Sequence, residues 1–175
     1  LLQQTLDSLL SQDIPLKEIH VVDDGSAIPI NKMNDSRIFY HRQKNKGKRY
    51  AQKRVIDTLS PDEVDFILTV DSDSQIEPQA VRKLLSAFNK DEKLMACTGT
   101  VLTSNFRENI LTRITDLNIG ISCIMARPIR SVFGALETTS GALALYRKEV
   151  FFDNIEDYVT SGTYSDDRRL CTYSV

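Results

Sequence analysis

The segment 66–74, Phe-Ile-Leu-Thr-Val-Asp-Ser-Asp-Ser, constrains the fold of this chain more than any other. Its apolar half predicts a buried strand, and the strand ends at two carboxylates, Asp71 and Asp73. In an open α/β sheet, ligands bind in the crevice beyond the carboxyl ends of the strands. Two carboxylates this close repel each other unless a cation lies between them, and their hard oxygen atoms suit Mg²⁺ or Mn²⁺. An Asp/Ser turn without a ligand is the alternative.

A second short apolar strand, expected at residues 18–22, also runs into carboxylates. Asp23 and Asp24 follow it, and Gly25 lets the backbone turn sharply after them. Such a loop can offer either aspartate as a hydrogen-bond acceptor to a base or a ribose. An Asp-Gly turn capped by Ser26 is the alternative.

A basic segment, Asn45-Lys46-Gly47-Lys48-Arg49, stands at the start of an expected helix. The helix dipole favours anions at this end, so cations placed there make sense if a phosphate lies between them and the helix. A solvated basic face is the alternative. A nucleic-acid partner is not expected, because only Tyr50 interleaves with these charges and the chain carries a net charge of −2.

Strands and helices alternate through residue 101, which predicts an α/β sandwich with a mostly parallel sheet. The chain of 175 residues is long enough for about one domain, covering residues 1–175. Further along, apolar residues at helical spacing from Ile110 to Met125 predict an amphipathic helix that ends near Ala126. We expect this apolar stripe to pack in the core, with contact to a membrane surface or a partner as the alternative.

Composition excludes several classes of protein. The three cysteines are far apart in sequence and lack ligand spacing, so neither a disulfide framework nor a zinc site is predicted, and a reduced compartment fits. No apolar run approaches the roughly 20 residues that span a bilayer, so the chain itself is expected to be soluble or peripheral. Both ends read as helices without a start or stop signal, and we expect residues 1–175 to be a fragment of a longer protein.

Two segments near the carboxyl terminus complete the candidate site. Residues 138–147 predict a strand entered through small residues, which allow a sugar ring or a backbone to approach closely. Residues 165–169, Ser-Asp-Asp-Arg-Arg, predict the start of a helix. Paired acids there are favoured by the dipole whatever their function. The functional interpretation is a general base, with one aspartate accepting a proton from an attacking hydroxyl.

Jointly and in this order, the segments resemble family 2 glycosyltransferases. The similarity is greatest to the processive branch that contains hyaluronan synthases, chitin synthases and nodulation N-acetylglucosaminyltransferases, and it extends over essentially the whole chain. The matching blocks are Val21-Val22-Asp23-Asp24-Gly25-Ser26, Asn45-Lys46-Gly47-Lys48-Arg49, Asp71-Ser72-Asp73-Ser74, Ser140-Gly141-Ala142-Leu143 with Tyr146-Arg147, and Asp166-Asp167-Arg168.

The resemblance implies a GT-A fold, a Rossmann-like α/β/α sandwich that binds a nucleotide sugar and a divalent cation, Mg²⁺ or Mn²⁺. It implies that Asp23 and Asp24 lie near uracil and ribose, and that Lys48 lies near the diphosphate. By the same likeness, Asp71 lies near the ribose or the metal, and Asp73 binds the metal.

For the acceptor side, the resemblance places the catalytic base at Asp167, with Asp166 and Arg168 beside it as substrate-binding residues. Ser140 and Gly141 would line the acceptor sugar. The implied reaction is an inverting transfer of a sugar, expected to be N-acetylglucosamine or a related one, from a UDP-sugar to a growing polysaccharide.

The chain also departs from the family pattern. The family's first strand would precede Leu1, the Gln-x-x-Arg-Trp block and the transmembrane helices of the processive enzymes are missing, and Ser165 replaces a common glycine. We therefore expect a full-length protein that is membrane-associated through these missing segments, with its catalytic domain facing the cytoplasm. The alternatives are a non-processive family 2 transferase that decorates a lipid or capsule, a non-catalytic nucleotide-sugar-binding module and, more weakly, a nucleotidyltransferase, whose Gly-rich phosphate loop is not visible.

Overall fold

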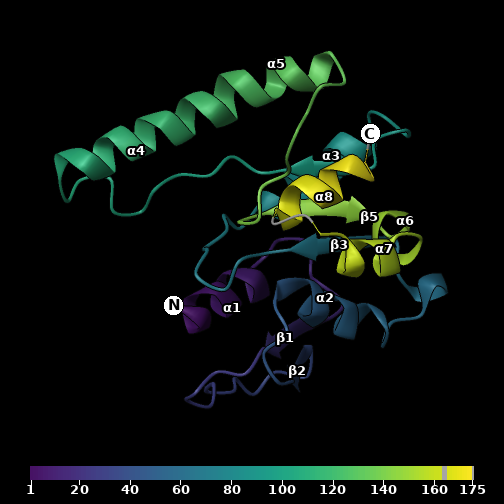
Figure 1. The fold of residues 1–175 in the computed structure, drawn as a ribbon. Helices are drawn as coiled ribbons and strands as arrows, with labels where there is room; N and C mark the ends of the chain where they lie inside the picture. Colours follow the sequence, from purple (N-terminus) through teal and green to yellow (C-terminus); the bar gives the residue numbers. More distant parts are fainter. Residues whose placement is uncertain (163–164, 175) are drawn as a thin grey trace.

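The computed structural model describes residues 1–162 and 165–174, and its strands and helices alternate in a mixed α/β fold, as predicted (Figure 1). The elements in chain order are α1 (Leu2–Leu10), β1 (Ile19–Asp23), β2 (Ile38–Arg42), α2 (Lys48–Ile56), η1 (Pro61–Glu63), β3 (Phe66–Thr69), α3 (Ala80–Phe88), β4 (Ala96–Thr98), α4 (Ile110–Ile121), η2 (Ser122–Ala126), α5 (Arg127–Val132), β5 (Ala144–Arg147), α6 (Glu149–Phe152), α7 (Ile155–Thr160) and α8 (Asp166–Thr172).

The five strands in the described part of the chain pair in two groups. β1 and β2 form a parallel pair, and the other three strands follow the order β3-β5-β4. β5 runs antiparallel to both of its neighbours, so β3 and β4 point in the same direction. The structure thus adds an antiparallel central strand to the predicted α/β architecture. β4 and β5 are consecutive antiparallel neighbours, so the segment 99–143 between them returns the chain without a crossover, whereas a crossover through one helix would give a parallel strand.

The carboxyl-terminal helices are held in place by the largest buried cluster. Its side chains come from α2, β5, α6, α7 and α8, and Tyr146, Phe151 and Tyr158 are each 1% exposed. Leu170 of α8 lies in the same cluster at 2% exposure. Leu170 therefore attaches helix α8 to the core through the apolar side of the helix. The predicted acidic pair forms the start of the same helix. The helix ends at Thr172, and Val175, which the sequence assigned to it, lies outside the described residues.

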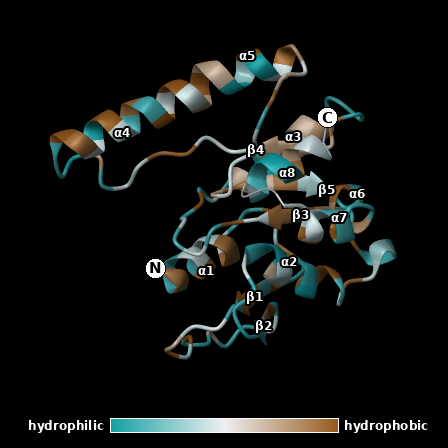
Figure 2. Ribbon diagram, in the orientation of Figure 1, coloured by the Kyte–Doolittle hydropathy of each residue, from teal (hydrophilic) through white to brown (hydrophobic). Residues whose placement is uncertain are grey.

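The expectation that the stripe from Ile110 to Met125 packs in the core is wrong. α4, η2 and α5 form one continuous helix, with a π-helical stretch at η2, that stands apart from the body of the domain (Figure 1). Apolar residues recur along it (Figure 2), and Ile110, Leu117 and Met125 are 77%, 65% and 58% exposed. Helical spacing defines an apolar face, but it does not specify which element covers that face. None of the helices in the described ranges has the length and apolar character needed to cross a membrane.

The two environments of leucine predict different costs of the same substitution. Leu170→Ala should lower the free energy of unfolding by about 2–5 kcal/mol, because it removes a buried side chain from a packed cluster. Leu117→Ala should change it by less than ~0.5 kcal/mol, because Leu117 is largely exposed. Urea unfolding measures both changes, provided that the free energy of unfolding depends on urea concentration with the same slope in all variants. A loss of stability in Leu117→Ala comparable to that in Leu170→Ala would contradict the exposed position of α4.

Candidate active site

The acidic segment after β3 forms a turn beside the start of α2. The Ser74 N–H donates to the Asp71 carbonyl oxygen at 3.0 Å, and the Thr5 hydroxyl of α1 donates to the Ser72 carbonyl oxygen at 3.0 Å. Asp71 accepts a hydrogen bond from Lys48 at 2.8 Å between Nζ and Oδ1. Asp73 is exposed. The structure thus joins the basic segment and the first aspartate of the Asp-x-Asp sequence, which lie far apart along the chain.

Asp24 anchors the loop that carries Lys48. Its Oδ1 atom accepts hydrogen bonds from Gln43 Nε2 at 2.7 Å and from the Lys46 N–H at 3.0 Å. Its Oδ2 atom accepts from the Gly47 N–H at 2.8 Å. These bonds, led by the one from Gln43, lower the pKa of Asp24 and keep it ionised. Because Gly47 directly precedes Lys48, this carboxylate fixes the start of α2.

Asp23 is buried at the end of β1 and lines a small pocket. Its Oδ1 atom accepts from the Ser26 N–H at 2.8 Å, and this bond lowers the pKa of its carboxyl group. The pocket has a volume of about 150 Å³, and Tyr40, Lys32 and Arg42 lie in its wall with Asp23. The two interpretations of Asp23, as a turn residue and as a binding residue, are therefore compatible. Asp23 closes the turn by accepting from Ser26, and it also lines the pocket.

A second group of acids meets the first at Gly141. A Cβ atom placed on Gly141 would lie 2.8 Å from Asp167 Oδ2 and 3.0 Å from Asp71 Oδ2. The absence of a side chain at this position therefore lets the two carboxylates approach the backbone of the strand entry. Lys48, Asp71, Gly141 and Asp167, four of the predicted site residues, converge here from four separate segments of the chain.

The surroundings of Asp167 make its carboxylate a stronger proton acceptor than an ordinary aspartate. Burial raises the pKa of its carboxyl group, and the charge of Asp71 adds to this effect. The charge of Lys48 and the Gly141 N–H act in the opposite direction, but the net pKa is raised. For Lys48, burial lowers the pKa, yet the bond to Asp71 and the surrounding acids outweigh it and the ammonium group stays charged. Carboxylates and a cation thus share one half-buried site.

Two residues that sequence reasoning did not place in the site hold the first turn of α8. The Thr139 hydroxyl lies 2.6 Å from the Tyr146 hydroxyl and donates to the Asp167 carbonyl oxygen at 3.1 Å. Both side chains are buried. Thr139 directly precedes the predicted Ser140-Gly141 pair, and Tyr146 belongs to the same block. The position of Tyr146 in that block and of Thr139 next to it was the available signal, since nothing in the local pattern indicates a contact with α8.

Arg49 does not fit the expectation for the basic segment, which placed its cations near a phosphate or on a solvated face. It follows Lys48 on α2, is 9% exposed, and forms an ion pair with Asp166 at the start of α8. Ser165 caps α8 by accepting from the Arg168 N–H. The structure therefore gives Asp166 a partner within the protein, while the side chain of Arg168 is exposed and forms no ion pair with the described residues.

Ser140 is buried, and its N–H donates to Thr98 of β4 at 3.1 Å. It directly precedes Gly141 in the chain. Its role toward an acceptor sugar stays a prediction.

The side chains that follow β3 carry the type of oxygen ligand that a divalent cation prefers. Asp71 and Asp73 supply carboxylate oxygens, which are the ligands that Mg²⁺ and Mn²⁺ prefer, and the exposure of Asp73 leaves it accessible to an ion bound with a substrate. Within residues 1–162 and 165–174, no three His, Cys, Asp or Glu side chains are grouped to hold a metal by themselves.

The acids and the cation thus gather beyond the end of a strand, which is where open α/β sheets bind their ligands. The chain belongs to glycosyl transferase family 2, whose model matches residues 1–153. It has the GT-A α/β fold of that family. Enzymes of this family generally use divalent metal ions.

The chain is similar to two kinds of curated protein. It is 36% identical, over an alignment 192 residues long, to the hyaluronan synthase of Streptococcus pyogenes, which covers 99% of this chain and 45% of the synthase. It is 32% identical to the N-acetylglucosaminyltransferases of Rhizobium sp. (strain N33) and Neorhizobium galegae, covering 97% of this chain and 40% and 42% of those proteins. The chain therefore spans less than half the length of these relatives.

Proposed function

We propose that this chain is the donor-binding catalytic core of an inverting, metal-dependent glycosyltransferase. It moves N-acetylglucosamine or a related sugar from a UDP-sugar to a growing polysaccharide. The observation that carries the proposal is the convergence of Asp167, Asp71 and Lys48 at Gly141. The similarity to proteins named hyaluronan synthase and N-acetylglucosaminyltransferase supports this choice of sugar and acceptor. In the full-length protein, membrane-spanning segments outside residues 1–175 would hold this domain at the cytoplasmic face.

In this mechanism, Asp167 accepts the proton of an acceptor hydroxyl. The acceptor oxygen then bonds to the anomeric carbon of the donor from one face, while the bond from that carbon to the diphosphate oxygen breaks on the other face and its electron pair leaves with UDP. The configuration of the sugar is inverted and no covalent intermediate with the protein forms. Proton acceptance by a positioned carboxylate is general base catalysis.

The donor side of the site binds and neutralises UDP. Lys48 changes partner from Asp71 to the diphosphate and stabilises its developing charge. Asp23 hydrogen-bonds the base in the pocket at the end of β1, and Asp24 keeps the loop before Lys48 in place near the ribose. Asp71 and Asp73 would hold a Mg²⁺ or Mn²⁺ ion, which would supply positive charge to the leaving diphosphate.

Calorimetric titration of UDP, with and without Mn²⁺, tests the donor site. The wild-type chain should bind UDP more tightly with Mn²⁺, and Asp73→Asn should remove that gain, because it weakens a metal ligand. Asp62→Asn, an exposed aspartate in η1, is the matched control and should bind like the wild type. Metal-independent binding that is equal in all three proteins would contradict the assignment of Asp73.

The raised pKa of Asp167 predicts the pH dependence of turnover. The base must be ionised, so kcat/KM should be constant at higher pH and should fall as the pH drops through the raised pKa of Asp167. This acidic limb should lie above the usual aspartate value of about 3.9. Lys48→Gln should move the limb to still higher pH, because the charge of Lys48 lowers the pKa of Asp167. A limb at or below the usual value, measured by release of UDP, would contradict this environment.

A further inference from the structure

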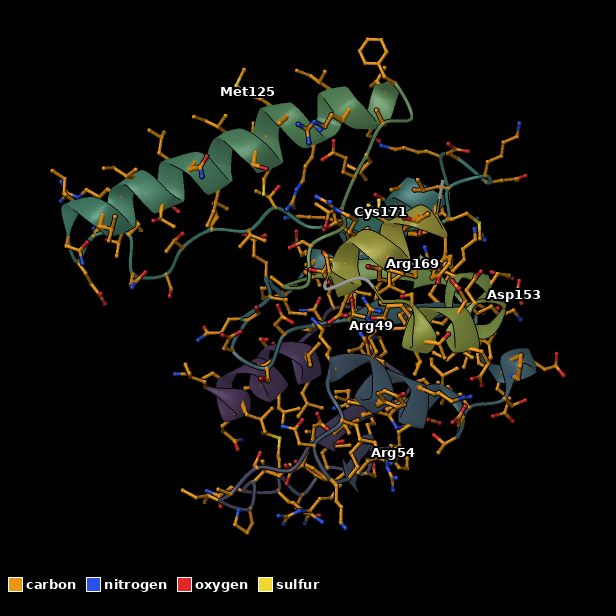
Figure 3. All side chains as sticks on the ribbon, in the orientation of Figure 1. Arg49, Arg54, Met125, Asp153, Arg169 and Cys171 are labelled. Atoms are coloured by element: carbon orange, nitrogen blue, oxygen red, sulfur yellow. The ribbon has the colours of Figure 1, made fainter. Side chains whose placement is uncertain are left out.

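Arg49 connects three segments at the buried end of the site. Its Nε atom donates to Asp166 Oδ1, and its Nη1 atom donates to the Tyr158 carbonyl oxygen at 3.1 Å. Nη1 also donates to the carbonyl oxygen and the hydroxyl of Ser161, both at 2.7 Å. The guanidinium carbon lies 5.2 Å from the centre of the Tyr158 ring. Figure 3 shows Arg49 between α2 and the carboxyl-terminal helices.

Two consecutive residues of α2 thus reach two different parts of the site. Lys48 pairs with Asp71 after β3, on the side proposed to bind the donor. Arg49 pairs with Asp166, which directly precedes the proposed base. Neighbouring residues on an α-helix point in directions about 100° apart, so both contacts can form from the same turn. The first turn of α2 is therefore attached to the start of α8.

We propose that Arg49 is a positioning residue for the base, which it holds over Gly141 through Asp166. The inference rests on the proposed function, because it takes Asp167 as the base. Leu170 anchors α8 to the core, and Thr139 binds the Asp167 carbonyl oxygen. The ion pair with Arg49 adds a side-chain contact next to Asp167, which fixes the rotation of the first turn and hence the direction of the Asp167 carboxylate.

The chemistry of arginine suits this role better than that of lysine. The guanidinium group is planar and offers five N–H donors in a fixed fork, so it can bind Asp166 and the backbone before α8 at the same time. An ammonium group is a point charge on a flexible chain. Arg49→Lys should therefore keep the charge opposite Asp166 but restore only part of the lost turnover.

A double-mutant cycle on the whole chain tests the inference. Arg49→Gln and Asp166→Asn should each lower kcat by roughly 10–100-fold, since a misplacement of about 1 Å can cost that much. The KM for UDP-N-acetylglucosamine and the affinity for UDP with Mn²⁺ should change by less than about twofold, because an interaction used only in the transition state lowers kcat alone. The double variant should lose no more than the more damaging single variant, because each substitution alone already removes the ion pair between Arg49 and Asp166.

Arg54→Gln is the matched control. Arg54 lies on α2 as well but is exposed, and Figure 3 shows it away from α8. Its substitution should leave kcat and UDP affinity at the wild-type values. Additive losses in the cycle, or a parallel loss of UDP affinity and kcat in Arg49→Gln, would overturn the inference in favour of a general structural role.

A measurement without turnover separates this inference from the proposed function. Hydrogen exchange of the α8 amides should be at least about tenfold faster in Arg49→Gln than in the wild type, while α3 (Ala80–Phe88) exchanges as before. Equal exchange in α8 would overturn the inference. If Asp167→Asn keeps wild-type turnover, the proposed base is wrong whatever the exchange shows. If that variant is inactive and Arg49→Gln is fully active, the inference alone fails.

Discussion

Replacement of Asp167 by asparagine should lower turnover by about 10²–10⁴-fold, the usual contribution of a positioned general base. Asparagine has nearly the same shape, so the contacts of the first turn of α8 should persist, but it cannot accept the acceptor's proton. The UDP affinity with Mn²⁺ should stay within about twofold of the wild type, because a group used only in the transition state does not contribute to ground-state binding. Release of UDP in the presence of acceptor and calorimetric titration measure the two quantities.

The control for this experiment is Asp153→Asn. Asp153 follows α6, is exposed and lies on a different part of the domain from the site (Figure 3). It should keep wild-type turnover and wild-type binding. Full turnover in Asp167→Asn would contradict the assignment of the base, and turnover lost together with UDP affinity would indicate a damaged donor site instead.

Gly141→Ala should lower turnover by about 10²-fold, even though it adds only one methyl group. That methyl group would lie 2.8 Å from Asp167 Oδ2, which is closer than Cβ atoms come to other atoms, and 3.0 Å from Asp71 Oδ2, which is a very tight contact. One or both carboxylates must move, and the proposed base then leaves its position. Gly141 does not have a positive φ, so the effect does not come from backbone strain.

Gly120→Ala is the matched control, because a Cβ atom at Gly120 meets nothing within 4 Å. It lies within α4, where alanine is favoured over glycine by about 0.5–1 kcal/mol, so this variant should be as active as the wild type and slightly more stable. UDP release and thermal unfolding measure both outcomes. Wild-type turnover in Gly141→Ala would show that the two carboxylates need not approach the strand entry for catalysis.

Local sequence patterns predicted the elements that carry the site. The apolar run before Asp71 forms β3, the apolar run that leads to Asp23 forms β1, and the acidic pair at Asp166 starts α8. These predictions succeed because burial of apolar runs and the preferences of helix ends act over a few residues. The five blocks in order also indicated the family, which the match to residues 1–153 confirms.

Local patterns could not predict which residues meet. Asp71, Gly141 and Asp167 lie on separate segments, and they meet because β5 pairs antiparallel with β3 while α8 packs on the core behind them. Arg49 looked like one more charge in a basic run, and its burial against Asp166 depends on α7 and α8. Such contacts are set by how elements pack, which a short stretch of sequence does not encode.

The long helix from Ile110 to Val132 also separates what the local sequence determines from what tertiary packing determines. Its sequence determined that it is helical and amphipathic, because the apolar spacing and the Asn109 cap act within the helix itself. Only the tertiary structure decided that its apolar face stays exposed while the equally apolar Leu170 is buried. The sequence by itself thus determined the elements, the family and the residue types of the site. The packing of distant segments decided which of those residues share one site, because burial and carboxylate contacts depend on neighbours far away in the chain.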